Sequence, residues 1–475
     1  MTDPFAPALA RASSRLSPPP TPAISIAIHV AVVGIWVALF LLAFGRGGLL
    51  AWSIGLAYLA YDSCLQLFTA WQISRINSAD VTPQSGGRPT IAVLIAAHNE
   101  ATVLPTTLAA LLTQNDPPDE IVIADDGSTD ATAAVLGQRY SPGIPVQVGS
   151  TSVIWLRLQH GGKSHALNSA LCSTAADVVL TVDADTVVDR GSVRAVRQAF
   201  STEAELAGVT GIITPVCAPT AKGRVLQWFQ TYEYIGNFLA RYAWMRMDCL
   251  QLISGAFAGF RREAVVVVGG FDDACLVEDY ELVARMQRYA GEHAVTWRFR
   301  VIGGAQARTE APGTATAFLR QRRRWFGGFL QTQWWYRAMV GERRFGALGT
   351  MMLPIKALDT VQPIYGLTAL ALFVYFLIDR RVDVLGPVLL VVLGKLAIDV
   401  VFQLWSLRRY RRWISDPHRA SVAGAAAAAV IAPFTFQLLL QAGAALGWLA
   451  FLAGAQSWGR QRRFGIGPRL DQMDG

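Results

Sequence analysis

Residues 120–128 read Glu-Ile-Val-Ile-Ala-Asp-Asp-Gly-Ser, an apolar run that stops at two carboxylates and a glycine. An apolar run bounded by turn residues is typical of a buried strand in a parallel sheet. Ser128 can cap a helix that follows, because its hydroxyl can accept a backbone N–H from the first helical turn. The stretch therefore predicts a strand, a turn and a helix, with the acidic pair at the carboxyl end of the strand.

The same pattern recurs on both sides of this stretch. Further apolar runs lie at 91–96, 153–158 and 177–182. Strands that alternate with helices indicate a doubly wound α/β sheet. Ligands of such sheets bind beyond the carboxyl ends of the strands. We therefore expect residues 97–100, 125–128 and 183–185 to meet at one site.

Long apolar stretches flank this α/β region. The chain has 475 residues, of which only 16% are charged and 52% are hydrophobic, and this balance favours one domain joined to a membrane bundle. The runs 24–44 and 49–71 are each long enough to span a bilayer and follow one another after a short break. Two spans in immediate succession favour a helical hairpin over a cleaved signal peptide.

The C-terminal part is apolar again. Residues 347–360 are interrupted by a proline and two charges and predict an interfacial helix, and residues 361–378 and 384–407 predict spans. The stretch 422–453 is too long for one upright span and short for two. One kinked span and a hairpin both stay open for it.

These patterns divide the chain into five parts. We expect a disordered cytoplasmic tail at 1–22, two transmembrane helices at 23–72, a cytosolic α/β domain at 73–345, an interfacial helix with about three transmembrane segments at 346–455, and a basic tail at 456–475. Arginines beside the spans place the large domain in the cytoplasm, in a multi-pass protein of the inner (plasma) membrane.

Charge and cysteine content exclude some classes. The net charge of +8 comes largely from arginines beside apolar runs, and neither an RNA-binding aromatic motif nor zinc-finger spacing occurs, so we expect no nucleic-acid partner. The five cysteines include no CxxC pair, and their odd number argues against a disulfide framework. The large polar segment is therefore expected in a reducing compartment.

Two acidic clusters follow predicted strands. Asp183 and Asp185 can hold a divalent ion, since Mg²⁺ takes one or two protein carboxylates and completes its shell with phosphate oxygens and water. Asp125 or Asp126 can accept hydrogen bonds from a base or a ribose. Taken alone, an Asp-x-Asp turn is more often a simple cap, and a helix cap is an equal alternative for the Asp125–Asp126 pair.

A glycine-rich turn precedes the next predicted helix. Residues 161–164 read Gly-Gly-Lys-Ser and resemble part of a phosphate loop, although Arg157 stands where the first glycine of that loop is needed. We interpret Lys163 as a point charge near a diphosphate. An ordinary surface lysine is the alternative.

Two later motifs complete the set. One is Gln321-x-x-Arg324-Trp325. The Arg324 guanidinium offers planar donors suited to a diphosphate, and the Trp325 indole offers a face for a sugar ring. A membrane-proximal Arg/Trp belt is the alternative.

The other motif is acidic. Residues 277–282 read Val-Glu-Asp-Tyr-Glu-Leu. Such an acidic run is usually a solvated helix start, but beside the other clusters we interpret Asp279 as the base that removes a proton from a sugar hydroxyl, with Glu278 next to it.

The ordered clusters resemble a known family. They are DDGS at 125–128, GGKSHALN at 161–168, DAD at 183–185, ED at 278–279 and QxxRW at 321–325. In this order and between apolar spans, they resemble the processive family 2 glycosyltransferases, and most of all the bacterial poly-β-1,6-N-acetylglucosamine synthases. The resemblance covers residues 91–335. It departs at Val277, where a threonine or similar polar residue often precedes the Glu-Asp pair.

The resemblance implies a GT-A (Rossmann-like) fold and an inverting reaction on a UDP-sugar with Mg²⁺ or Mn²⁺; UDP-N-acetylglucosamine is preferred only by resemblance. It implies that Asp125 and Asp126 face the uridine and that Asp183 and Asp185 hold the ribose, diphosphate and metal. Asp279 would be the general base, and the 321–325 motif would clamp the diphosphate and shape the acceptor site. Implied partners are the UDP-sugar, a growing polysaccharide, the lipid bilayer and an accessory membrane subunit.

Three functions follow as hypotheses. The first is a membrane-embedded synthase that polymerises a UDP-sugar into an exported β-linked polysaccharide. The second is a non-processive transferase that moves one sugar to a lipid carrier. The third is a transporter or scaffold whose nucleotide-sugar domain is regulatory. The QxxRW motif and the C-terminal spans favour the first.

Overall fold

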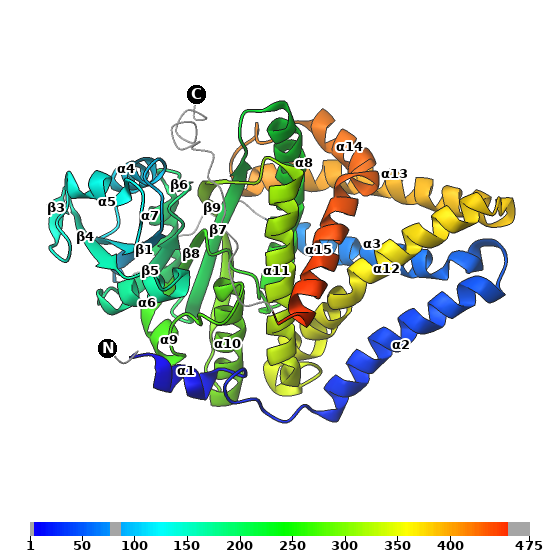
Figure 1. The fold of residues 1–475 in the computed structure, drawn as a ribbon, viewed down its shortest axis with the longest axis horizontal. Helices are drawn as coiled ribbons and strands as arrows, with labels where there is room; N and C mark the ends of the chain where they lie inside the picture. The colour runs from blue at the N-terminus through cyan, green and yellow to red at the C-terminus, as the bar shows by residue number, and fades with distance from the viewer. Residues whose placement is uncertain (1–3, 77–86, 455–475) are drawn as a thin grey trace.

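The computed structural model describes residues 4–76 and 87–454. In these residues a nine-stranded mixed sheet forms the centre of the α/β part, with strand order β3-β4-β2-β1-β5-β8-β7-β9-β6 (Figure 1). The strands are β1 (Ile91–Ala97), β2 (Glu120–Asp126), β3 (Val146–Val148), β4 (Thr151–Leu158), β5 (Val178–Val182), β6 (Thr186–Val188), β7 (Leu206–Val216), β8 (Phe257–Arg261) and β9 (Arg298–Glu310).

The parallel half of the sheet agrees with the expected strands. β1 pairs in parallel with both β2 and β5, and β2 pairs in parallel with β4. Six of the seven residues of β1 are buried, because helices cover both faces of this half. The carboxyl ends of β1, β2 and β5 lie together at one edge, where the polar residues predicted for the site begin.

The other half of the sheet is antiparallel in part. β8 runs antiparallel to β5 and β7, and β6 runs antiparallel to β9. The sheet is therefore mixed rather than wholly parallel. The helices of this part are α4 (Leu104–Leu112), α5 (Thr132–Gly137), α6 (Lys163–Cys172), α7 (Ser192–Thr202), α8 (Ala221–Met245), α9 (Arg262–Val267), α10 (Glu278–His293) and α11 (Ala315–Trp335).

Apolar helices extend from the α/β part. Among the described residues, four helices are long and apolar enough to cross a membrane: α2 (Ala23–Gly45), Gly48–Ile73 with α3 (Ser53–Ile73), Leu348–Ile378 with α12 (Leu353–Ile378), and α13 (Val382–Trp413). They project together to one side of the sheet (Figure 1). Val30 and Leu41 of α2 are 65% and 64% exposed, an apolar surface that suits lipid rather than water. An α/β domain joined to apolar helices is thus confirmed.

The expected interfacial helix is not a separate element. A π-helical turn, Leu348–Met352, runs directly into α12, which continues to Ile378. Pro354 has no N–H to donate to the preceding π-helical turn, and the Gly349 carbonyl of that turn accepts the Gly341 N–H at 2.8 Å instead. Lys356 and Asp359 pair at 2.7 Å, and the Tyr61 hydroxyl also donates to Asp359. The charges that indicated an interface are therefore satisfied within the bundle.

The last apolar stretch is bent. Helix α14 (Val422–Ile431) with a following 3₁₀ turn meets α15 (Phe436–Leu452) at an angle of 49°. Pro433 lies in the turn, and α15 then packs along α11 (Figure 1). The basic tail expected at 456–475 lies outside the described residues.

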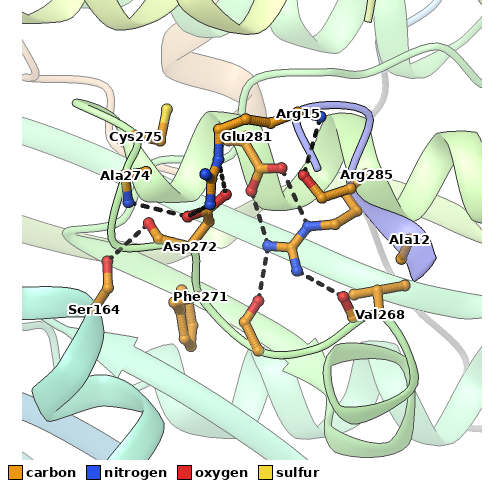
Figure 2. A network of polar contacts seen from close by, with 12 residues as sticks. Ala12, Arg15, Ser164, Val268, Phe271, Asp272, Ala274, Cys275, Glu281 and Arg285 are labelled. Carbon is orange, nitrogen blue, oxygen red and sulfur yellow. Dashed lines mark hydrogen bonds and ion pairs between the residues drawn. The ribbon is translucent and has the colours of Figure 1, made fainter. Parts of the chain in front are cut away.

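The N-terminal segment corrects another expectation. Residues 1–22 were expected to be a disordered tail, but helix α1 (Ala6–Ala12) packs beside α10. Arg15, just beyond it, forms a bidentate ion pair with Asp272 (Figure 2). The composition of this segment indicated disorder. It could not reveal the ordered position, because the partner of Arg15 lies more than 250 positions away in the sequence.

Candidate active site

A cavity of about 2040 Å³ lies at the carboxyl ends of the parallel strands. Its lining combines the strand-end loops with helices α8, α10 and α11, and it continues to residues of α12 and α15. Nine of the ten residues predicted for the site line it: Asp126, Lys163, Asp183, Asp185, Glu278, Asp279, Gln321, Arg324 and Trp325. Motifs separated by up to 199 positions in the sequence thus converge on one cavity.

Lys163 joins two of the acidic motifs. It begins α6 directly after Gly162, whose φ of +94° a residue with a side chain would rarely adopt. Its Nζ lies 2.7 Å from Asp183 Oδ1 and 2.9 Å from Glu278 Oε1. Burial lowers the pKa of Lys163, but these two carboxylates outweigh burial, so that its pKa is raised. The lysine is a fixed positive charge between the two motifs.

Asp183 and Asp185 differ in exposure. The side chain of Asp183 is 31% exposed, whereas Asp185 is 3% exposed and accepts a hydrogen bond from the Thr309 hydroxyl at 3.4 Å. Both line the cavity. Two carboxylates one residue apart supply hard oxygen ligands of the kind that Mg²⁺ and Mn²⁺ prefer. The donor set of this turn therefore fits such an ion.

The acidic pair after β2 is bound by its own loop. Asp126 accepts hydrogen bonds from the backbone N–H of Gly161 (2.8 Å) and of Gly162 (2.9 Å), and it contacts His160 Nδ1 at 2.8 Å. Asp125 is 1% exposed, accepts from the Ser128 N–H and does not line the cavity. Asp126 thus holds the glycine-rich turn that carries Lys163 in place.

Two histidines beside Asp126 were not part of the predicted site. The rings of His98 and His160 stack with centroids 4.5 Å apart. With Asp126 they form a group whose ligand atoms lie within 4.8 Å of one another, close enough to hold a metal ion. Sequence reasoning missed them because they lie 62 positions apart and show no metal-ligand spacing.

Asp279 occupies a constrained position at the start of α10. It accepts the Gly255 N–H at 2.6 Å and the Tyr280 N–H at 2.8 Å. Burial raises the pKa of Asp279, and the adjacent carboxylate of Glu278 raises it further; Lys163 and the two N–H donors oppose the shift without cancelling it. A Cβ atom at Gly255 would lie 2.9 Å from Asp279 Oδ2. Only glycine at 255 allows this close approach.

Helix α11 carries the third part of the lining. Gln321 Oε1 is buried and has no hydrogen-bond partner among the described residues. Arg322, next to it, forms a bidentate pair with Glu233 of α8 at 2.5 and 2.7 Å, and its guanidinium lies 4.6 Å from the Trp325 ring centre. This ion pair joins α8 to α11, and both helices line the cavity.

One face of α8 also lines the cavity. Another face of this helix packs in the main core; it comprises Trp228, Tyr232, Ile235, Leu239 and Tyr242. The cavity face comprises Tyr234, Asn237, Phe238, Arg241 and Trp244. Its spacing of three and four residues is helical but mixes polar and aromatic types, so a search for apolar periodicity does not detect it.

Arg241 is the most informative residue of that face. Its Nε and Nη1 atoms are buried without a partner among the described residues, and its guanidinium lies 4.5 Å from the Phe238 ring centre. Burial lowers the pKa of Arg241 to about 10, against the influence of Tyr234, Asp279 and Glu233. The side chain remains charged at neutral pH, and two of its guanidinium nitrogens have no partner among the described residues although the residue lines the cavity.

Comparisons with known proteins point to one family. Residues 178–390 match the model of the glycosyl transferase family group 2. The poly-beta-1,6-N-acetyl-D-glucosamine synthase of Staphylococcus aureus (strain COL) is 28% identical over 240 residues, which are 50% of this chain and 54% of the synthase. The probable glycosyltransferase YdaM of Bacillus subtilis (strain 168) is 28% identical over 252 residues, 50% of this chain and 55% of that protein. The chain thus spans about half the length of the curated relatives it matches.

A solved structure supports the same fold. The mannosyltransferase PcManGT from Pyrobaculum calidifontis, in complex with GDP-Man and Mn²⁺, has a TM-score of 0.51 and 20% identity, covering 81% of this chain and 99% of its own. The GT-A-type fold is thereby confirmed. The range that matches the family model, residues 178–390, contains the Asp183–Asp185 turn, Asp279 and the 321–325 motif. Residues 178–390 therefore resemble a glycosyl transferase family group 2 domain, and this range contains most of the residues that line the cavity.

Proposed function

We propose that the protein is a membrane-embedded, inverting glycosyltransferase that polymerises a UDP-sugar into an exported β-linked polysaccharide, with UDP-N-acetylglucosamine as the favoured donor. One observation carries this proposal: a single cavity contains the acidic residues of the sheet edge and continues between the apolar helices to Gln362, Gln437 and Gln441. A donor site and a polar path into the bundle are then parts of one space. The similarity to a poly-beta-1,6-N-acetyl-D-glucosamine synthase favours a donor that carries N-acetylglucosamine.

The donor occupies the sheet side of the cavity in this proposal. Asp183 and Asp185 would hold Mg²⁺ or Mn²⁺, which when bound offsets the charge that builds on a departing diphosphate. Lys163 adds a fixed positive charge beside Asp183. Arg324 and Gln321 bind the diphosphate from α11, and Trp325 offers its ring to the sugar.

The acceptor approaches from the α8 side. Asp279 takes the proton of the acceptor hydroxyl as that oxygen attacks the anomeric carbon, and UDP leaves on the opposite face. A raised pKa suits this role, because a carboxylate that holds its proton more tightly is a stronger base. Gly255 fixes the orientation of the carboxylate through its N–H.

The path beyond the site is polar within apolar helices. Gln437 and Gln441 of α15 both donate to the Tyr58 hydroxyl of α3, at 3.4 and 3.3 Å. Polar side chains inside a membrane bundle usually face its interior or a water-filled space. We place the site on the cytoplasmic side of the plasma membrane, with the product leaving through the bundle and an accessory membrane subunit assisting its export.

The test is UDP release from the purified protein in detergent, across a panel of UDP-sugars with Mg²⁺, Mn²⁺ or a chelator, with products sized in the same samples. One active donor that yields long polymer in the presence of metal is expected. One active donor that yields only a single sugar on a lipid carrier would replace polymerisation by lipid glycosylation. Silence across the panel, with or without added membrane extract, would overturn the proposal in favour of a regulatory nucleotide-sugar domain.

A further inference from the structure

The segment of residues 5–17, here named the N-terminal strap, is docked on the catalytic domain. Phe5 and Leu9 are buried, and a Cβ atom at Gly269 would lie 2.2 Å from the backbone nitrogen of Leu9. Arg288 of α10 donates to the Ala12 carbonyl at 3.1 Å and to the Ser14 hydroxyl at 3.0 Å. Direct backbone contact with a glycine and buried hydrogen bonds define one docked position for the strap.

The strap places one charge inside the domain. Arg15 donates through Nε to Asp272 Oδ2 at 3.0 Å and through Nη2 to Oδ1 at 2.8 Å (Figure 2). The Asp272 side chain is 0% exposed. The Arg15 guanidinium also lies 5.8 Å from the ring centre of Trp335, at the end of α11. A fully buried carboxylate with a bidentate arginine loses a large stabilising interaction if that arginine is removed.

Asp272 in turn contacts two elements of the site. Its backbone carbonyl accepts the Ser164 hydroxyl at 3.1 Å, and Ser164 directly follows Lys163 in α6. Its carboxylate accepts the Ala274 N–H at 3.0 Å, within the loop that ends at Glu278. Lys163 and Glu278 are themselves paired across the cavity. A displacement of Asp272 therefore reaches both partners of that ion pair.

The other end of the same loop is held by α10. Arg285 donates to the carbonyls of Val268 (2.6 Å) and Gly270 (2.8 Å), and it pairs with Glu281 at 2.8 Å (Figure 2). Glu281 also accepts the Tyr336 hydroxyl at 2.6 Å. Residues 268–270 are thus fixed by Arg285 inside the domain. The strap contacts the loop that follows them through the Asp272 side chain.

We propose that Arg15 is a positioning residue for glycosyl transfer: through Asp272 it sets the loop 271–277, and thereby Lys163 and Asp279, in the geometry that the reaction requires. This inference rests on the proposed function, because it assigns Arg15 a role in that reaction. Arg15 does not line the cavity and touches no reacting atom. Its effect is on geometry, and misplacement of reacting groups by about 1 Å can cost on the order of 10²-fold in rate.

The experiment compares three full-length variants with the wild type. Arg15→Met removes both hydrogen bonds while keeping the length of the side chain. Arg15→Lys keeps the charge but not the two-pronged donor. Arg11→Met is the matched control, because Arg11 lies in the same strap and is exposed. For each protein we would measure kcat and KM for UDP release, the stoichiometry of UDP binding, and the melting temperature.

Activity is counted per UDP-binding site, so that loss of folded protein does not count as loss of rate. Arg15→Met should lower kcat/KM by about 10- to 100-fold per site, Arg15→Lys should recover part of that loss, and Arg11→Met should match the wild type. An Arg15→Met protein with wild-type kcat/KM per site, even with a lower melting temperature, would show that the strap only stabilises the fold. A wild type that consumes no UDP-sugar would instead remove the proposed function.

Discussion

Asp279 is the residue whose role can be tested most directly. Replacement Asp279→Asn keeps the size and the acceptor oxygen that binds the Gly255 N–H, but it removes the carboxylate that we propose as the base. We expect transfer to fall by about 10²- to 10⁴-fold while UDP binding persists, since general-base catalysis contributes that much. UDP binding measured by calorimetry beside UDP release would separate the two. Loss of UDP binding in a folded variant would show that Asp279 binds the donor instead.

The same residue predicts a pH dependence. The proposed base must be deprotonated to act, and the pKa of Asp279 is raised. The rate should therefore decline as the pH falls through a value above about 3.9, the ordinary aspartate pKa. The measurement is kcat/KM for UDP release against pH, with UDP binding followed over the same range. The Asp279→Asn variant should retain a low rate without this acid limb. An identical limb in both proteins would assign it to another group.

Gly255 tests the geometry at that carboxylate. The methyl group of Gly255→Ala would lie 2.9 Å from Asp279 Oδ2 and 3.2 Å from its Cβ, so the carboxylate must move. We expect kcat to fall by about 10- to 100-fold. Gly236→Ala is the control, because a Cβ there meets nothing within 4 Å and alanine favours the helix. Equal activity of both variants in the UDP-release assay would mean that Asp279 needs no fixed orientation.

At the scale of elements, sequence patterns predicted the strands and helices whose formation depends on residues that are neighbours in the sequence. The strand after residue 119 was predictable because an apolar run, two aspartates and a glycine occur together in the sequence. β9 was missed because its residues 298–310 include several arginines and two adjacent glycines, and because its pairing with β7 shifts register at Gly211–Ile212. The strap was missed because its order depends on Asp272 and Arg288, which the local sequence does not contain.

Helix α8 gives the element-scale prediction. Its cavity face carries Arg241, whose Nε and Nη1 atoms have no partner in the part of the chain that the structure describes, and this face borders the region in which we propose the acceptor. Arg241→Met should lower kcat/KM by about 10-fold or more, because a bound acceptor oxygen loses its charged donor, while the Kd for UDP stays near the wild-type value. Arg246→Met, at the C-cap of the same helix and outside the cavity lining, is the control. A weaker Kd for UDP in Arg241→Met would place this residue at the donor instead.

At the scale of the whole molecule, the notable feature is that one cavity belongs to two structural parts. The strand-end motifs are separate in sequence, and the sheet edge alone brings them together. The α8 and α11 helices, tied by Glu233 and Arg322, close the cavity on the other side, and α12 and α15 extend it among the apolar helices. Sequence motifs predicted the part of the cavity at the sheet edge. They could not predict the part between the apolar helices, because the glutamines that line it lie within stretches whose sequence indicates only membrane spans.

This continuity predicts that chemistry and product length can be separated. Gln441 lines the cavity, is 5% exposed, and has a buried Oε1 without a partner among the described residues. If a saccharide passes this point, Gln441→Leu should shorten the polymer by several-fold, since a polar contact with the chain is lost, while the initial rate of UDP release changes less than about 3-fold. Gel filtration of the product beside the UDP-release assay measures both quantities. Leu449 lies on the same helix and is 64% exposed, so Leu449→Ala should change neither the polymer length nor the rate of UDP release. Polymer of unchanged length from Gln441→Leu would mean that the growing chain leaves the cavity before it reaches α15.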